Sequence, residues 1–307
     1  MKSIHWRTWR KRRSCLAGGS RWPPPDALRS LLSRFPPLPE IDYASVNRYW
    51  EGVTPSILGP YMMDGFGFPV SAGDFRFRAE SRIVRRLTRN LNPNPVVLDL
   101  GSGVGHWAKQ FAQDFSQVVA VEGSRVLYQA LKERCAGYPN VRPVLGDVLS
   151  FELDDKYDLV FLGGLLMYLD ESNVIALLQR LVPCLEPGGI ILCRESTVRG
   201  ETVTRDGEYP VVYRSVSVYR ELFKRSGLIV QHVERNEPYV LMQMACELIK
   251  KWKEFVPARF QALRIVGPLA YGGMRLGNPW ITRPPRALGI PFPKLENHFF
   301  VLGTASS

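Results

Sequence analysis

The stretch that decides the fold is "VVLDLGSGVGHW", residues 96–107. A short apolar run, with one acid inside it, ends at three glycines spaced two residues apart. Such a run predicts a buried strand that turns sharply into a helix. Because glycine has no Cβ, its backbone can come close to a ligand and can adopt a positive φ. We therefore expect a strand over 96–100, a helix over 104–114 and, between them, a ligand-binding turn at Gly101, Gly103 and Gly105.

Strand and helix patterns alternate after this stretch. Strands are expected over 117–123, 141–147, 157–164, 190–196, 228–237 and 298–304. Helices are expected over 124–137, with Ser124 as its N-cap, over 171–189, with Ile175 and Leu178 facing inward, and over 216–226. Continuous apolar strands that alternate with helices indicate a mostly parallel sheet covered on both faces. The prediction is a doubly wound α/β fold with seven strands.

Five segments follow from this pattern. We expect a basic, flexible tail over 1–40, an N-terminal helical lid over 41–94 and a core over 95–237. The lid includes an amphipathic helix over 74–91. An insertion over 238–296, helical and then rich in Pro and Gly, separates the last two strands and is expected to cap one end of the sheet. Residues 297–307 form the terminal strand and tail.

The positive charge is concentrated in two places. The net charge is +11, and residues 1–40 and 250–296 each contain nine Lys or Arg against two acids. Such flanks suit a phosphorylated substrate, nucleic acid or a membrane surface, or they are simply solvated. The amphipathic stretch over 248–267 allows a membrane-surface role, or core packing with one solvated face.

Composition excludes several other classes of protein. The chain has 307 residues, of which 45% are hydrophobic and 22% charged, as in an ordinary globular protein. No apolar run approaches 18 residues, and the basic N-terminus lacks the apolar region of a secretory signal. Five scattered cysteines without a CxxC pair indicate reduced thiols, with Cys184 and Cys193 in the core, and no zinc site. We expect a cytoplasmic protein without a metal.

The acid in the opening stretch indicates what the turn binds. A dinucleotide-binding turn needs G-x-G-x-x-G, and its third glycine would fall on His106. Asp99, two residues before the first glycine, suits an ammonium group better than a pyrophosphate. We expect His106 and Trp107 to pack the following helix rather than to take part in chemistry.

The stretch resembles motif I of the class I S-adenosylmethionine (SAM) methyltransferases, and the resemblance covers about residues 95–237. It implies SAM as the cofactor. Asp99 would help to orient its methionyl end, Glu122 would bind the ribose hydroxyls, and Asp147 and the N–H of Val148 would meet the adenine. Other roles remain open: Asp99 braces the turn, Glu122 faces a helix N-terminus, or Asp147 caps a turn.

The methyl acceptor is expected near the loops after the fourth and fifth strands. The candidates for catalysis are Glu195, Tyr168 and Arg214, with Ser196, Tyr209 and Tyr213 near them. Glu195 faces the acceptor or pairs with Arg194 or Arg214, and Tyr168 lines the pocket or packs. Tyr49 and Trp50, with Phe66, form a lid over the SAM sulfonium or pack in the core.

A more distant resemblance links the chain to protein α-N-terminal methyltransferases. It rests on "RYWEGVTPSILGPYMMDGFGF", "CRES" and "VVYRSVSVYRELFKRSGL". The family's asparagine falls on Ser196, its catalytic aspartate on Ser217 and its substrate-loop histidine near Met167 or Tyr168, which argues for a different acceptor.

Three hypotheses follow. The first is a SAM-dependent methyltransferase that acts on an O or N nucleophile of a polar small molecule, anionic acceptors included. The second is a protein N-terminal α-amine methyltransferase. The third is a non-catalytic SAM-binding protein that interacts with nucleic acid. The oligomeric state is left open.

Overall fold

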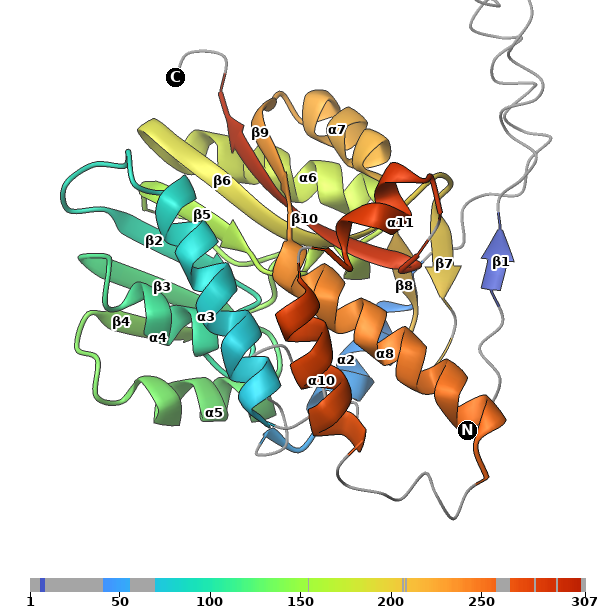
Figure 1. The fold of residues 1–307 in the computed structure, drawn as a ribbon. Helices are drawn as coiled ribbons and strands as arrows, with labels where there is room; N and C mark the ends of the chain where they lie inside the picture. Colours follow the sequence, from blue (N-terminus) through green and yellow to red (C-terminus); the bar gives the residue numbers. More distant parts are fainter. Residues whose placement is uncertain are drawn as a thin grey trace, which may run out of the picture.

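A computed structural model describes residues 6–8, 41–55, 70–153, 155–205, 207, 209–257, 266–278, 280–290 and 292–304. Its centre is a seven-stranded sheet in the order β4-β3-β2-β5-β6-β10-β9 (Figure 1). The strands are β2 (Val96–Leu100), β3 (Gln117–Glu122), β4 (Val141–Leu145), β5 (Tyr157–Leu162), β6 (Leu185–Val198), β9 (Ile229–Arg235) and β10 (Leu295–Gly303). β10 alone in this sheet runs antiparallel, to both of its neighbours. The predicted doubly wound, mostly parallel sheet is confirmed.

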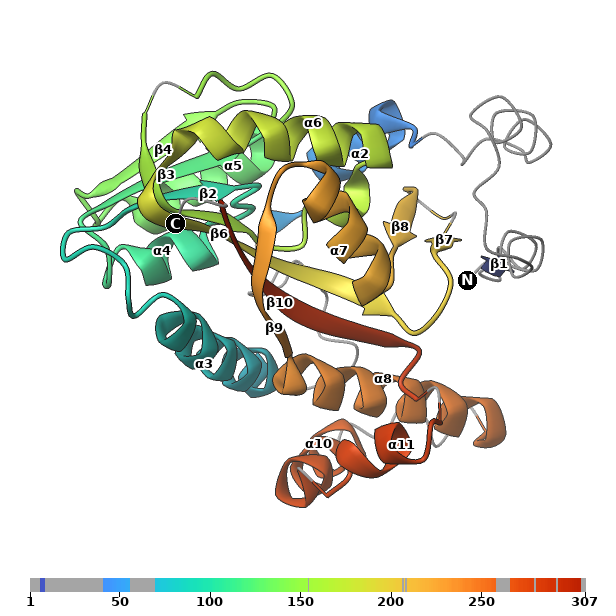
Figure 2. The same ribbon diagram turned by 90° about the horizontal axis from the view of Figure 1, so that it is seen from above.

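Helices cover both faces of the sheet because successive strand residues point to opposite sides. Val97, Leu159 and Phe161 pack with α3 (Val70–Leu87), α4 (His106–Phe111) and α5 (Arg125–Cys135). Leu98 and Val160 pack on the other face with α6 (Glu171–Leu181) and α7 (Val216–Arg225). Figure 2 shows α3 and α6 on opposite sides of the strands. The chain reverses its order between β2 and β5, where ligands of such sheets bind beyond the carboxyl ends of the strands.

The helix starts follow from local capping chemistry. The Ser124 side chain accepts a hydrogen bond from the N–H of Leu127 at the start of α5, as predicted, and Asp170 and Ser215 cap α6 and α7 in the same way. Trp107 is buried in α4 against Phe111 and Phe161, so its packing role is confirmed.

The segment from α6 to β6 differs from the prediction. The expected helix over 171–189 ends at Leu181, a 3₁₀ turn spans Val182–Cys184, and β6 begins at Leu185 rather than at residue 190. Pro183 has no N–H to continue the α-helix, which explains the early end. Within α6, Leu178 is buried as expected, but Val174 and Leu177 are buried and Ile175 only partly so.

A small second sheet was not predicted. β7 (Val203–Arg205) and β8 (Val211–Tyr213) form a hairpin, and β1 (Trp6–Thr8) pairs with β7. Each strand has three residues, too few for an alternating pattern to stand out in the sequence. The backbone bridge between Thr197 and Arg214 joins the end of β8 to β6.

Two parts of the chain flank the sheet. In the predicted lid, α2 (Tyr43–Glu51) lies near the carboxyl ends of the strands, whereas α3 packs on the sheet through Val84. The insertion forms α8 (Glu237–Phe255), α10 (Val266–Gly277) and α11 (Arg283–Ala287). α8 packs on α3 and α10 through a cluster that includes Ala72, Val240 and Met274 (Figure 2). The rest of the predicted tail over 1–40, and Phe66, lie outside the described residues.

Several sequence predictions concern the described residues as a whole. Cys135, Cys184, Cys193 and Cys246 are buried free thiols. Within the described part of the chain, no group of His, Cys, Asp or Glu is arranged to hold a metal ion. Across the same residues, every helix is too short or too polar to cross a membrane.

Candidate active site

The glycine turn after β2 has the geometry of a ligand-binding elbow. Gly101, Gly103 and Gly105 have φ values of 72°, 56° and 83°, a region that side chains disfavour. The N–H groups of Gly101 and Ser102 both donate to the carbonyl of Val121, at 2.9 and 3.0 Å, and tie the elbow to β3. A Cβ on Gly105 would lie 2.6 Å from Leu131 Cδ1, so this glycine also lets α4 pack on α5.

Asp99 is a buried acid beneath this elbow. It is 1% exposed, and its Oδ2 accepts no hydrogen bond from any described residue. Burial, with a smaller contribution from the nearby Glu122, raises the pKa of Asp99 to about 7 against the opposing effect of Ser102. A buried acceptor without a donor is costly, and a cationic ligand group would relieve that cost. Asp99 therefore fits the ammonium group of SAM.

Glu122, at the end of β3, points toward the same elbow. Its Oε2 accepts from the N–H of Gly103 at 2.8 Å and its Oε1 from the N–H of Ser124 at 2.9 Å. Burial raises the pKa of Glu122, although these hydrogen bonds oppose the shift. Each oxygen of a carboxylate has a second lone pair, so Glu122 can still accept from two hydroxyl groups.

Asp147 lies beyond the end of β4, since that strand stops at Leu145 instead of the predicted residue 147. Its Oδ1 accepts from the N–H of Leu149 at 2.8 Å, and the side chain is exposed. Asp147 therefore caps a turn, which was one of its two predicted roles. The N–H of the adjacent Val148 donates to no acceptor in the described part of the chain.

Arg180 holds the loop after Asp147, and sequence reasoning missed it. From α6 its guanidinium donates to the carbonyls of Leu149 and Phe151 and, at 3.4 Å, to that of Val148. These contacts join residues about thirty positions apart, and no local pattern signals them. Arg180 thus fixes the backbone that would meet the adenine.

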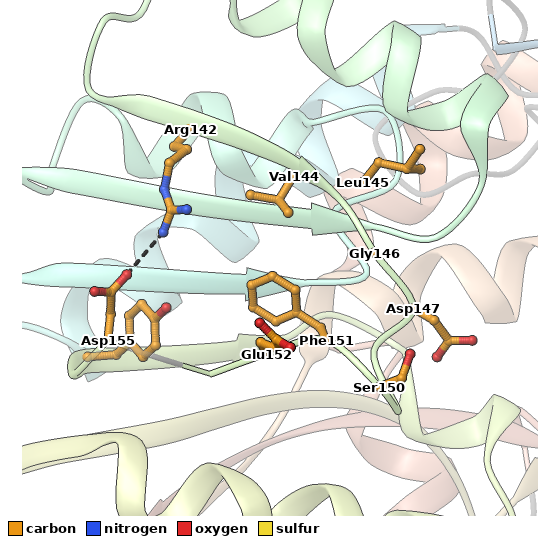
Figure 3. A pocket seen from close by; sticks show the side chains of 10 residues that line it. Arg142, Val144, Leu145, Gly146, Asp147, Ser150, Phe151, Glu152 and Asp155 are labelled. Carbon is orange, nitrogen blue, oxygen red and sulfur yellow. Dashed lines mark hydrogen bonds and ion pairs between the residues drawn. The ribbon is translucent and has the colours of Figure 1, made fainter.

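A hollow of about 410 Å³ lies between β4 and the segment that connects it to β5 (Figure 3). The ion pair of Arg142 and Asp155, 3.0 Å long, lies at one end and Asp147 at the other. Neither Asp99 nor Glu122 lines the hollow. It is therefore distinct from the elbow and shares only its rim with the expected adenine site.

Glu195 and Arg214 hold the loop that follows β5 through hydrogen bonds to its backbone. Glu195 is fully buried, and its Oε1 accepts from the N–H groups of Leu165 and Leu166, both at 3.0 Å. Arg214 donates to the carbonyls of Leu166 at 2.8 Å and Leu169 at 2.6 Å. Burial raises the pKa of Glu195 to about 7. The observed hydrogen bonds of Glu195 are all to this loop, through Oε1, whereas its Oε2 has no partner among the described residues.

Arg194, the other expected partner of Glu195, belongs to a buried ionic network. Its Nε donates to Glu80 at 2.6 Å, where Arg76 donates at 2.8 Å and Asn236 at 2.8 Å. Burial alone would raise the pKa of Glu80, but the guanidinium groups of Arg194 and Arg76 lower it to about 2. This network joins α3, β6 and the start of α8 behind the loop.

Four aromatic rings, from α2, from the 3₁₀ turn after β5 and from the segment before β8, pack together. Tyr49 lies 4.1 Å from Tyr209 and 4.9 Å from Trp50, ring centre to ring centre, and Tyr168 lies 5.7 Å from Tyr209 and 5.8 Å from Trp50. The Trp50 carbonyl accepts from Ser124 Oγ at 3.0 Å, which docks α2 beside Glu122. The predicted lid residues Tyr49 and Trp50 are thus brought together with the candidate Tyr168.

The phenols of Tyr168 and Tyr209 stay protonated at neutral pH. Burial and the neighbouring phenols of Tyr209 and Tyr213 raise the pKa of Tyr168 well above its usual value. Burial, Tyr49 and Tyr213 raise the pKa of Tyr209 to about 12. These groups can position an acceptor but cannot take its proton.

The two serines that depart from the N-terminal methyltransferase pattern have local partners. Ser196 Oγ donates to the Tyr239 hydroxyl at 3.4 Å, and Ser217 Oγ lies 2.8 Å from Ser215 Oγ. Ser196 is buried, whereas Ser217 is exposed in the first turn of α7.

Comparisons with known proteins agree with this geometry. Residues 97–189 match the model of a methyltransferase domain. A wheat (Triticum aestivum) phosphoethanolamine N-methyltransferase 1 is 33% identical over 42% of this chain and 26% of its own length. A Xenopus laevis N-terminal Xaa-Pro-Lys N-methyltransferase 1-A is 24% identical over 64% of this chain and 89% of its own length. The match thus spans about a quarter of the wheat relative.

A solved structure supports the fold. A SAM-dependent methyltransferase from Leishmania major superposes with a TM-score of 0.55 at 17% identity, over 85% of this chain and 82% of its own. The matched domain contains the strands that carry the elbow and Asp99, whose unpartnered oxygen fits the cofactor. Residues 97–189 therefore form a methyltransferase domain of the class I, S-adenosylmethionine-dependent type.

Proposed function

We propose that the chain methylates the amine nitrogen of a small polar acceptor, held against Tyr49, Trp50, Tyr168 and Tyr209. The observation that carries this proposal is the four-ring cluster beside the elbow. Aromatic faces attract ammonium groups and methylated ammonium groups most of all. The names of the wheat and frog relatives support a nitrogen acceptor, since both are N-methyltransferases.

The residues that hold the cofactor have separate roles in this proposal. When bound, S-adenosylmethionine supplies an electrophilic methyl group on its sulfonium. Asp99 accepts from the ammonium group, Glu122 accepts from the ribose hydroxyls, and Asp147 with the N–H of Val148 faces the adenine. Gly101 and Gly103, which have no side chains, leave room for the cofactor at the elbow.

Glu195 and Arg214 act through the loop they hold. By fixing Leu165, Leu166 and Leu169, they place Tyr168 in the aromatic cluster. They are positioning residues in this proposal, not groups that touch the acceptor. Water exclusion and alignment of the nitrogen with the methyl group then supply most of the rate enhancement.

In this mechanism, the acceptor amine loses its proton to solvent. The phenols of Tyr168 and Tyr209 stay protonated, and the Oε1 atom of the buried Glu195 is held by backbone N–H groups. An amine must lose its proton before it attacks, so the rate should rise with pH until the free acceptor is deprotonated.

The test is methyl transfer from labelled SAM to three acceptors: phosphoethanolamine, ethanolamine and a peptide with an Xaa-Pro-Lys N-terminus. Mass spectrometry of the products identifies the methylated atom. The proposal expects an N-methylated small amine and no such product with the Tyr168→Ala and Tyr209→Ala double variant. Methylation confined to oxygen, or to the peptide, would contradict it.

Protein N-terminal methylation is the second candidate. It is favoured by the frog relative, because the match covers 89% of that protein's length. The serines at positions 196 and 217 weigh against it, since they stand where the resemblance implies an amide and an acid. The peptide arm of the same experiment decides between the two.

A further inference from the structure

The exposed apolar side chains of the molecule gather on the insertion. Nine large apolar residues are exposed among the described ones, and seven of these lie within residues 248–290. They are Leu248, Phe255, Leu269, Leu276, Trp280, Leu288 and Ile290. Five of the seven are at least 65% exposed, far more than Leu145 and Ile229 elsewhere. A concentration of this kind marks an interaction surface.

Helix periodicity places these residues on outward faces. In α10, Met274 is buried against α8, whereas Leu269 (65% exposed) and Leu276 (87% exposed) are seven residues apart and share the opposite face. In α8, the buried stripe of Leu241 and Met244 continues at Leu248 and Phe255, beyond the part that neighbours cover. Figure 2 shows α10 and α11 on the side of α8 that faces away from the sheet.

The charge on this surface is predominantly positive. Between residues 248 and 294, the exposed charged residues that the structure describes are six basic and one acidic, Glu254. The basic residues are Lys250, Lys251, Lys253, Arg275, Arg283 and Lys294. Trp and Leu side chains interspersed with lysines are typical of helices that lie in the headgroup region of a bilayer.

We propose that α8, α10 and α11 form a docking surface for an anionic membrane, with the apolar side chains inserted among the acyl chains and the lysines at the phosphate level. Anionic lipid complements the positive charge, and Trp280, 82% exposed, suits the interface between water and hydrocarbon. This surface is separate from the proposed amine site and does not depend on it.

Other occupants fit the surface less well. A second copy of the chain would bring two strongly basic surfaces together in a symmetric contact, and like charges repel. The N-terminal 40 residues contain nine basic residues against two acids, so the same repulsion acts on them. Nucleic acid would complement the charge but would leave the exposed leucines in water.

The experiment is co-sedimentation of the full chain with phosphatidylcholine vesicles, with and without phosphatidylserine. Binding is expected only to the anionic vesicles, with a blue shift of Trp fluorescence that Trp280→Phe removes. Reversing three charges (Lys250→Glu, Lys251→Glu and Lys253→Glu) should weaken binding about 100-fold. Removing two apolar groups (Leu276→Ser and Trp280→Ser) should weaken it about 30-fold.

The matched control is the double variant Leu145→Ser and Ile229→Ser, which removes exposed apolar groups elsewhere on the molecule and should bind vesicles as the unaltered chain does. Calorimetry with SAM confirms that every variant is folded. Absence of vesicle binding overturns the proposal, as does an equal loss in the control. A dimer in sedimentation velocity that Leu276→Ser dissociates, without vesicle binding, would assign the surface to a second copy and also overturn it.

Discussion

Two buried acids at the carboxyl edge of the sheet make an instructive pair. Asp99 on β2 and Glu195 on β6 are both almost fully buried, and burial raises the pKa of each to about 7. Glu195 accepts two backbone hydrogen bonds from the loop after β5. Asp99 lies beneath a backbone elbow and its Oδ2 has no donor among the described residues. Glu195 holds a loop through Oε1, and its Oε2, like Oδ2 of Asp99, has no partner among the described residues.

The two halves of the sheet around Asp99 and Glu195 also differ in what holds their loops. On the β2–β3 side, the backbone is arranged around the ligand site, and Glu122 keeps its carboxylate at the elbow. On the β5–β6 side, long side chains such as Arg214 hold a loop, and the proposed acceptor surface is aromatic. Substitutions should therefore affect cofactor affinity on one side and stability or positioning on the other.

The largest effect is expected for Arg214→Met. The substitution removes the donors to the carbonyls of Leu166 and Leu169 and leaves these groups buried, which should cost about 3 kcal/mol of unfolding free energy. Urea denaturation measures the loss. Arg220→Met, on the exposed face of α7, is the control and should change stability by less than about 0.5 kcal/mol. A small loss for Arg214→Met would mean that the loop does not depend on it.

Glu80 should make the β6 side sensitive to acid. Its pKa is lowered from 4.5 to about 2 in the folded chain, so its stabilisation is present above pH 4.5 and is lost as the pH falls toward 2. That shift corresponds to about 3 kcal/mol. Unfolding free energies measured over this range should decline less in Glu80→Gln, whose stability at neutral pH is already reduced. Parallel pH profiles for the two proteins would contradict the assignment.

Asp99→Asn should weaken SAM binding about 30-fold, because a charge-assisted hydrogen bond to the ammonium group is lost. The fold should remain, since the ionised acid is itself disfavoured by burial. Isothermal calorimetry gives the affinity. Asp155→Asn, which removes an exposed acid from the hollow along β4, is the matched control and should leave the affinity unchanged.

The same acid predicts how cofactor affinity depends on pH. With a pKa of about 7 before binding, Asp99 must release its proton to meet an ammonium group at lower pH. Affinity should therefore rise about tenfold between pH 6 and pH 8, with a larger rise than in Asp99→Asn. Calorimetry in buffers of different ionisation enthalpy should also detect the released proton. If SAM affinity depends on pH equally in the unaltered chain and in Asp99→Asn, Asp99 does not contact the ammonium group.

The smallest effect is expected for Glu195→Gln. The amide oxygen can still accept from Leu165 and Leu166, so kcat should fall less than about threefold, and SAM affinity should not change. Glu195→Leu removes the acceptor and should lower kcat strongly while it spares the affinity. A large fall in kcat for Glu195→Gln would contradict this positioning role and would indicate that Glu195 contacts the acceptor directly.

Much of the cofactor half could be predicted from the sequence because its signals are local. The strand, the three glycines and Asp99 lie within ten consecutive residues, and Glu122 ends the next strand. The hairpin of β7 and β8 escaped prediction because three-residue strands show no periodicity. Arg180 escaped because its partners lie about thirty residues away.

By itself, the sequence determined the doubly wound sheet, the elbow and the class of cofactor, since each follows from hydrophobic periodicity and from glycines at fixed spacing. Only the tertiary structure decided that Glu195 and Arg214 hold a loop and that four rings from three segments form one cluster. The loop contacts join residues 29 to 48 positions apart, and the rings of Tyr49 and Tyr209 come from residues 160 positions apart. The packing of helices and strands determines which of these residues come into contact, and their spacing along the chain does not reveal it.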